Sequence, residues 1–138
     1  VRESQYMSLH TDYALVTVLE HLGEDPDALN IEWAEFAGDA STLQTFDVTT
    51  TKPLDAYFEI QLYDVGTFGH EVLVNGEPLT GFDLPPSDGW QLWMDTVTGA
   101  MLQQGENTVQ VVRDSESDDE FAIGNVIIHW RSESSRER

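Results

Sequence analysis

The chain of 138 residues has the length of one ordinary domain, and its 40% hydrophobic and 10% aromatic residues are enough for a packed core. It contains no cysteine, which excludes a disulfide scaffold and any metal site with cysteine ligands. With 26 Asp and Glu against 6 Lys and Arg, the formal net charge is -20. We do not expect free nucleic acid as a partner, because its phosphates would meet a field of their own sign.

The charge also predicts the habitat. Acidic residues are spread along the whole chain, whereas Lys52 is the only lysine. Repulsion among so many like charges destabilises a compact state at low ionic strength. At molar salt the Debye length falls to about 3 Å and the repulsion is screened. We therefore expect a protein of a halophilic organism; the alternative is an acidic protein of ordinary salinity that binds cations or basic partners.

No segment approaches the roughly 20 apolar residues that cross a bilayer, so no membrane span is expected. The N-terminal residues show no basic stretch followed by an apolar one, and no signal peptide is predicted. A cytoplasmic location is the default expectation, and a virion or cell-surface location is the alternative.

In chain order, residues 1–12 are polar and are expected to be a flexible N-terminal segment. Residues 13–22 fit both a helical stripe and a strand alternation, and their β-branched Val-Thr-Val centre favours a strand. Further strands are predicted at residues 31–36, 43–49, 57–63, 70–74, 77–80, 90–96, 107–113 and 121–130. A single β-sandwich domain is expected over residues 13–131, followed by a polar C-terminal tail at 132–138.

Two local signals fix the geometry of these strands. Asn75-Gly76 predicts a tight hairpin, because a type I′ turn needs positive φ at both central residues. In the last strand, Ile123 and Val126 share one face only if an extra residue stands at Gly124-Asn125, which predicts a β-bulge. Eight or nine short strands with turn signals about every 8–12 residues indicate an antiparallel all-β sandwich or barrel.

A more specific pattern distinguishes between these two architectures. Residues 71–76, Glu-Val-Leu-Val-Asn-Gly, precede an aromatic strand, then Leu102–Val109, and finally an apolar strand that ends in Ile-His-Trp130. This order resembles the galactose-binding-like jelly roll, a fold that supplies many carbohydrate-binding modules. The resemblance implies an antiparallel jelly-roll sandwich and a carbohydrate ligand, but no sugar-contacting residue carries over, because that fold binds through variable loops.

From Tyr13 to Trp130 the chain also resembles a family of small haloarchaeal proteins of unknown function. The residues that carry this resemblance are 33–38, 63–70 and 88–95.

The aromatic segment at residues 88–95 holds most of the candidate ligand-binding residues. Trp90 and Trp93 are three positions apart, so they face opposite sides of an extended strand. An exposed indole can stack on a sugar ring while Asp88 or Asp95 accepts hydroxyl hydrogen bonds. The alternative is that both tryptophans pack into the core.

Two further candidates are Tyr63 and His70. Tyr63 shares a polar strand face with Tyr57, Glu59 and Gln61, which suits a ligand-binding sheet, the wet side of a sheet or a subunit contact. His70, beside an acidic residue, is the histidine with the best claim to a binding role.

Residues 114–120 contain several carboxylates in seven positions, in the style that calcium prefers. A structural calcium site would use Asp114, Glu116, Asp118 and Asp119. The EF-hand pattern fails, because Asp119 stands where that loop needs glycine. The alternative is a solvated acidic loop.

No catalytic motif is present: the chain lacks a Gly-x-Ser-x-Gly elbow, a phosphate-binding glycine loop and a His-x-x-x-His pair. We therefore expect no enzyme and no cofactor besides the possible calcium. The first functional hypothesis is a non-catalytic binding module for a carbohydrate or glycan. The alternative is a structural or assembly protein, a homo-oligomer with protein partners and no small-molecule ligand.

The charge imbalance predicts salt-dependent folding. The melting temperature should rise strongly between roughly 0.1 M and 2 M KCl, as repulsion is screened and apolar burial is strengthened. Thermal unfolding followed by circular dichroism across that range measures it. A melting temperature that stays flat would contradict the halophilic interpretation.

Overall fold

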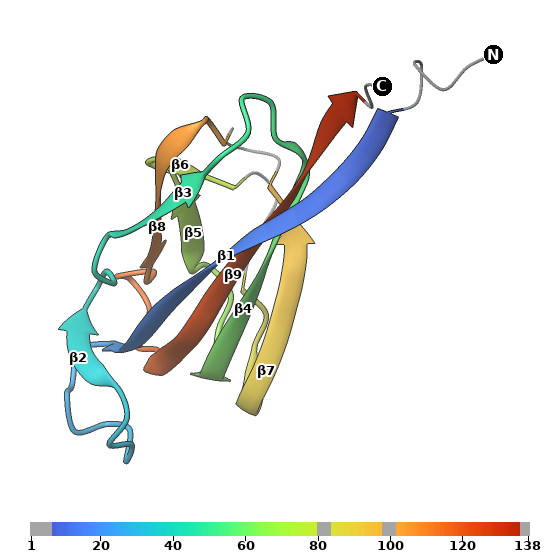
Figure 1. The fold of residues 1–138 in the computed structure, drawn as a ribbon. Helices are drawn as coiled ribbons and strands as arrows, with labels where there is room; N and C mark the ends of the chain where they lie inside the picture. Colours follow the sequence, from blue (N-terminus) through green and yellow to red (C-terminus); the bar gives the residue numbers. More distant parts are fainter. Residues whose placement is uncertain (1–6, 80–83, 98–101, 136–138) are drawn as a thin grey trace.

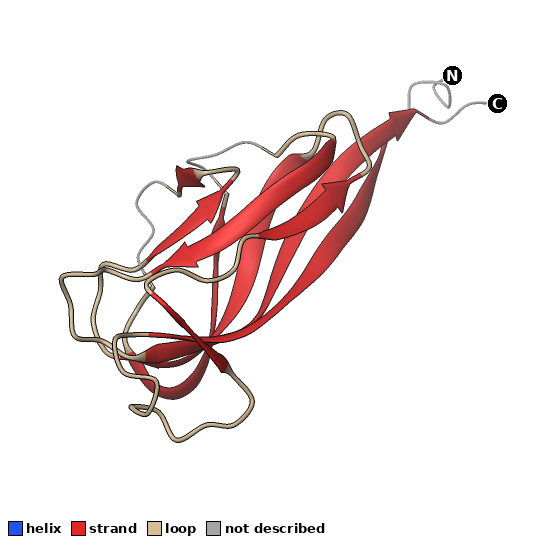
Figure 2. Ribbon diagram, turned by 90° about the vertical axis from the view of Figure 1, so that its left-hand side faces the viewer, coloured by secondary structure: helices blue, strands red, loops and turns tan. Residues whose placement is uncertain are grey.

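The computed structural model describes residues 7–79, 84–97 and 102–135 (Figure 1). These residues form strands and loops, and Figure 2 draws no helix among them. The part of the chain described here contains no helix long and apolar enough to cross a membrane. The strands are β1 (Met7–Leu22), β2 (Glu35–Gly38), β3 (Gln44–Val48), β4 (Leu54–Val65), β5 (Glu71–Val74), β6 (Glu77–Pro78), β7 (Ser87–Thr96), β8 (Gly105–Val112) and β9 (Phe121–Ser135).

The nine strands form two sheets with the orders β2-β1-β9-β4-β7 and β3-β8-β5-β6. When β2 is set aside, each sheet has four strands, all paired antiparallel, and most connections pass from one sheet to the other. If these eight strands are numbered along the chain, the first sheet has the order 1-8-3-6 and the second has the order 2-7-4-5. This is the double Greek key of a jelly roll, which confirms the expected fold class.

Strand β2 is the exception to antiparallel pairing. It runs parallel to β1, with Glu20 opposite Glu35, at the edge of the five-stranded sheet. The predicted strand at 31–36 was therefore placed too early, because residues 31–34 are an irregular segment that carries Trp33 away from this edge. The predicted return strand at 77–80 is β6, and its residue 80 lies outside the described part of the chain.

The core lies between the two sheets. On β4, Phe58, Ile60 and Leu62 are completely buried, as their alternation with polar residues predicts. Val72 on β5 and Val111 on β8 approach them from the other sheet. Full burial of each such side chain stabilises the fold by about 1.5–3 kcal/mol relative to exposure.

Strands β1 and β9 are longer than the sequence indicated. Residues 13–22 are strand, as favoured, but β1 begins at Met7 and β9 continues to Ser135, with Met7 opposite Ser135. In Figure 1 the two strands project together beyond the rest of the sheet. Polar residues expected in flexible ends are ordered here because the main-chain groups of each strand pair with the other. Residues 1–6 and 136–138 lie outside the described range.

The predicted bulge in β9 is present. Residues 60–62 of β4 face residues 123–126 of β9, so Gln61 stands opposite both Gly124 and Asn125. The Gln61 Oε1 atom accepts a hydrogen bond from the Asn125 main-chain N–H at 3.0 Å. The extra residue returns the apolar side chains to the core face on both sides of the bulge.

The hairpin between β5 and β6 also follows the prediction. Val74 pairs with Glu77, and the two residues between them, Asn75 and Gly76, have φ of 53° and 81°. Both values lie in the left-handed region that a type I′ turn requires. Space is open around Gly76, because a Cβ built there meets nothing within 4 Å.

Gly76→Val should therefore destabilise the protein through backbone conformation alone, by at least about 1–2 kcal/mol, because a branched side chain is strained at positive φ. Gly76→Asn is the matched control, since Asn tolerates this region, and it should cost under about 1 kcal/mol. Urea unfolding of both variants in about 2 M KCl measures the difference. Equal stabilities of the two variants would show that the turn is not type I′.

Candidate functional site

The side chains of the five-stranded sheet that point away from the core form one continuous surface, here called the outer sheet face. Strand register places them in rows that cross β1, β9, β4 and β7. The rows are Tyr13, His129, Tyr57 and Thr96; Leu15, Ile127, Glu59 and Met94; and Thr17, Asn125, Gln61 and Leu92.

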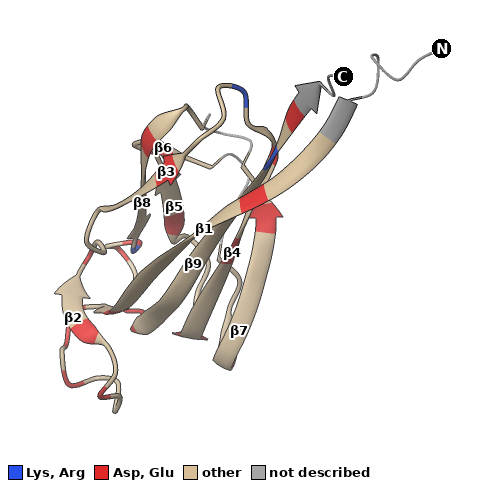
Figure 3. Cartoon of the chain, in the orientation of Figure 1, with Lys and Arg blue, Asp and Glu red and all other residues tan. Residues whose placement is uncertain are grey.

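These twelve positions contain one acidic residue, Glu59, although the chain carries a net charge of -20. Its carboxylate Oε1 lies 2.6 Å from His129 Nε2 and accepts a hydrogen bond from it. In Figure 3 the central parts of β7 and β9 are free of acidic positions, whereas red marks loops, the ends of these two strands and a band on β1. The three rows are thus a nearly uncharged area on a strongly acidic molecule.

Three aromatic rings lie across the middle of this face. The rings of Tyr57 and His129 are stacked, with centroids 4.4 Å apart and planes inclined by 7°. The Tyr13 ring flanks His129 from β1 at 6.2 Å, and 63% of Tyr13 is exposed. Because Glu59 holds the imidazole from the next row, the rings are oriented before any ligand arrives.

A second aromatic group stands at one end of the same face. Trp90 stacks on Trp33 with centroids 5.0 Å apart, and Tyr63 meets both indoles edge-on at 5.4 and 6.1 Å. Trp33 comes from the loop between β1 and β2. Trp90 is 53% exposed. A Cβ at Gly124 would lie 3.2 Å from Trp90 Cζ3, so glycine lets the indole approach β9 closely.

The structure separates the tryptophans expected to serve one site. Trp93 pairs in register with Ile60 and packs against the core, while Trp90 points outward. Their three-residue spacing on an extended strand causes this. Asp88 is exposed at the start of β7, and Asp95 lies on the inner side opposite Phe58. Of the six predicted ligand-binding residues, Trp90 and Tyr63 are brought together on the outer sheet face.

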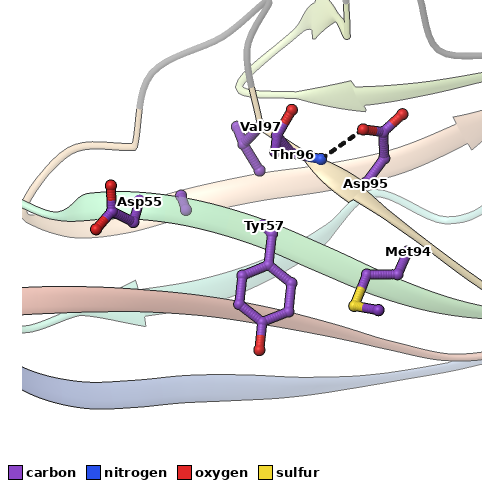
Figure 4. A pocket seen from close by; sticks show the side chains of 7 residues that line it. Asp55, Tyr57, Met94, Asp95, Thr96 and Val97 are labelled. Carbon is purple, nitrogen blue, oxygen red and sulfur yellow. Dashed lines mark hydrogen bonds between the residues drawn. The ribbon is translucent and has the colours of Figure 1, made fainter.

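An open pocket of about 640 Å³ adjoins this face where β4 and β7 meet (Figure 4). It is lined by Asp55, Ala56, Tyr57, Met94, Asp95, Thr96 and Val97. Figure 4 shows the Tyr57 and Met94 side chains pointing to the same side, so the pocket is continuous with the aromatic row. Its carboxylates are both engaged: Asp55 Oδ2 lies 3.7 Å from Arg131, and Asp95 Oδ1 accepts the Thr96 N–H at 2.7 Å.

His70 is a structural residue, which corrects the expectation of a binding role. It is completely buried, and its ring stacks on Phe121 at 4.3 Å. Its Nδ1 accepts the Asp114 main-chain N–H at 3.0 Å, and its Nε2–H donates to Asp119 Oδ2 at 2.7 Å. Because Nδ1 accepts a hydrogen bond, the proton that is donated to Asp119 lies on Nε2.

The four residues predicted to bind calcium do not converge. Asp119 is buried and accepts hydrogen bonds from the Gly66 and Thr67 main-chain N–H groups as well as from His70. Asp114 Oδ1 accepts the Glu116 N–H, whereas Glu116 and Asp118 are exposed. No group of three or more metal-ligating side chains occurs in the part of the chain that the structure describes. The donor set therefore does not fit a calcium site.

No local sequence signal indicates that Trp33 belongs to the site, because its position depends on contacts that are remote in the chain. Glu120 accepts the main-chain N–H groups of Glu24 and Asp25 through Oε2 and pairs with His21 through Oε1 at 2.7 Å. These bonds hold the start of the loop that carries Trp33 to Trp90. The acidic segment before β9 thus positions part of the outer sheet face.

Comparison with known proteins gives the family. The chain belongs to a family of unknown function (DUF7383), whose model matches residues 10–132. No curated protein matches it. Among solved structures it is similar to the Podospora anserina GH26-CBM35 β-(1,4)-mannanase, with 13% sequence identity and a TM-score of 0.45. The match covers 99% of this chain and 29% of the mannanase chain, so this chain spans under a third of that protein.

Replacement of Asp119 tests the structural role of its carboxylate. Asp119→Ala should cost about 3 kcal/mol or more, because it leaves buried N–H groups and His70 without their acceptor. Asp118→Ala, at the exposed neighbouring position, is the matched control and should change stability by less than about 0.5 kcal/mol. Urea unfolding in about 2 M KCl compares them. Similar effects of the two changes would mean that Asp119 is a solvated loop residue.

Proposed function

We propose that this member of the family is a non-catalytic binding module that holds an uncharged carbohydrate chain on the outer sheet face. The observation that carries the proposal is the row of rings from Tyr13 through His129 to Tyr57, open to solvent and continuous with the pocket beside Met94.

Carbohydrates present two kinds of surface, and this face offers a partner for each. The C–H faces of sugar rings pack on flat aromatic side chains, which the tyrosines and Trp90 supply. Sugar hydroxyl groups need both donors and acceptors. Thr17, Asn125 and Gln61 provide both in the row next to the aromatic residues. Gln61 uses its carbonyl oxygen on Asn125, which leaves its amide nitrogen as a donor to a ligand.

The arrangement is rigid, which favours binding without a large entropic cost. Every residue of the three rows lies on a paired strand, and the central imidazole is held by stacking on Tyr57 and by its bond to Glu59. Side chains that are ordered before binding lose little conformational freedom when a ligand arrives.

Charge selects the class of carbohydrate. A net charge of -20 repels sulfated or uronic-acid polymers at moderate salt. The outer sheet face itself contributes one acidic residue in twelve positions, and that residue is paired with His129. An uncharged polysaccharide meets neither long-range repulsion nor an unpaired carboxylate there.

A protein partner is the second candidate. Leu9, Leu15, Leu92 and Met94 are exposed large apolar residues on the same sheet. Exposed apolar residues that gather into a patch usually mark a contact with another protein. An assembly role would use these residues in place of the polar row.

The binding proposal predicts that Tyr13→Ala weakens binding to an uncharged glycan at least about 30-fold, since loss of a central aromatic contact commonly costs about 2 kcal/mol. Phe68→Ala is the matched control, because Phe68 is 61% exposed, close to the 63% of Tyr13, but lies in the loop between β4 and β5. It should bind like the wild type.

The measurement is a glycan array in about 2 M KCl, followed by isothermal titration with the best uncharged polysaccharide for wild type and both variants. Absence of binding to every glycan, or equal binding by wild type and Tyr13→Ala, would overturn the carbohydrate proposal.

A further inference from the structure

Strand β7 is an edge strand of the five-stranded sheet as the described residues form it. Among the described strands it pairs with β4 and with no other. The Val97 N–H donates to the Ala56 carbonyl, and main-chain groups alternate in direction along a strand. Residues 91, 93 and 95 therefore direct their N–H and C=O groups toward β4, and Trp90, Leu92 and Met94 direct theirs away from the sheet.

Between Asp88 and Asp95, this edge lacks the charged residues and prolines that usually prevent edge-to-edge pairing. Residues 89–94 carry no charge in a chain of net charge -20, and β7 contains no proline or lysine. The residues whose main-chain groups point away from the sheet also expose apolar side chains on the outer sheet face: Leu92 is 58% exposed and Met94 56%. The six central residues of β7 therefore suit pairing with another strand.

We propose that two copies of this chain associate through β7, pairing antiparallel about a two-fold axis at Leu92. This register matches the outward main-chain groups of both copies, with Leu92 opposite Leu92 and Trp90 opposite Met94 of the second copy. The cross-strand pairs bury three apolar side chains from each copy, including an indole against a thioether.

The local absence of charge allows a second copy to occupy this edge, and the antiparallel register is self-complementary. Two molecules of charge -20 repel over most of their surfaces, and association is least opposed where neither presents carboxylates. Between Asp88 and Asp95 the edge offers six uncharged positions, so carboxylates are confined to the ends of the paired strands. A two-fold axis perpendicular to the sheet keeps both outer sheet faces on the same side, which joins them into one surface of doubled width.

Cysteine substitution tests the register directly, because the chain contains no cysteine. Hydrogen-bonded antiparallel partners have Cα atoms about 5.5 Å apart, within the range of about 4.4–6.8 Å that a disulfide bridges. Oxidised Leu92→Cys should form a covalent dimer nearly completely in about 2 M KCl. Leu15→Cys is the matched control, since Leu15 is 56% exposed on β1, far from the edge, and it should remain monomeric on a non-reducing gel.

Light scattering gives the second readout. The wild type should have twice the monomer mass, and Leu92→Pro should have the monomer mass with its fold retained by circular dichroism, because this proline removes an N–H that does not face β4. If Leu92→Pro fails to fold, Leu92→Lys serves instead. A monomeric wild type, equal cross-linking of both cysteine variants, or dimers that survive both Leu92 changes would overturn the proposal.

The test is independent of the carbohydrate. Tyr13→Ala lies on β1, away from the edge, and should leave the dimer mass unchanged. Loss of glycan binding with an intact dimer, or a dimer that binds no glycan, therefore identifies which of the two proposals has failed.

Discussion

The hydrogen bonds of the buried Asp119 carboxylate hold together the end of the sandwich at which the loops after β1, β4 and β8 lie. This carboxylate accepts main-chain hydrogen bonds from Gly66 and Thr67 and pairs with His70, so the loop after β4 is fastened to the start of β9. The next residue, Glu120, does the same for the loop after β1 through the N–H groups of Glu24 and Asp25. Two adjacent acidic residues thus connect three loops from distant parts of the chain.

A buried cation completes this arrangement. Arg113 is almost fully buried at the end of β8, and its guanidinium lies 3.0 Å from Asp39 and donates to the Ser117 carbonyl at 2.8 Å. Buried charges are tolerated only when they are paired and hydrogen-bonded. In a protein so rich in acidic residues, one arginine and two histidines therefore organise the loops, while most of the other carboxylates remain at the surface.

The buried acidic residues also affect the outer sheet face, because they hold the loops beside it. The loop held by Glu120 brings Trp33 onto Trp90, and the remaining rows stay open. The bulge at Gly124 lets Trp90 lie close to β9. The same bulge that keeps the apolar residues of β9 on the core face thus also positions an aromatic ring on the outer sheet face.

The sequence by itself determined most of the strands, the hairpin at Asn75-Gly76, the bulge in β9 and the opposite orientations of Trp90 and Trp93. Each depends on a local rule: side-chain alternation, the φ demanded by a turn, or one residue too many in a strand. Tertiary structure alone decided the pairing of β1 with β9 out to Met7 and Ser135, the parallel β2, and the burial of His70 and Asp119. These results come from partners at least 15 residues away in the chain or from hydrogen bonds to distant main-chain groups. An acidic residue looks the same in the sequence whether its carboxylate is buried against distant main-chain groups or is solvated by water.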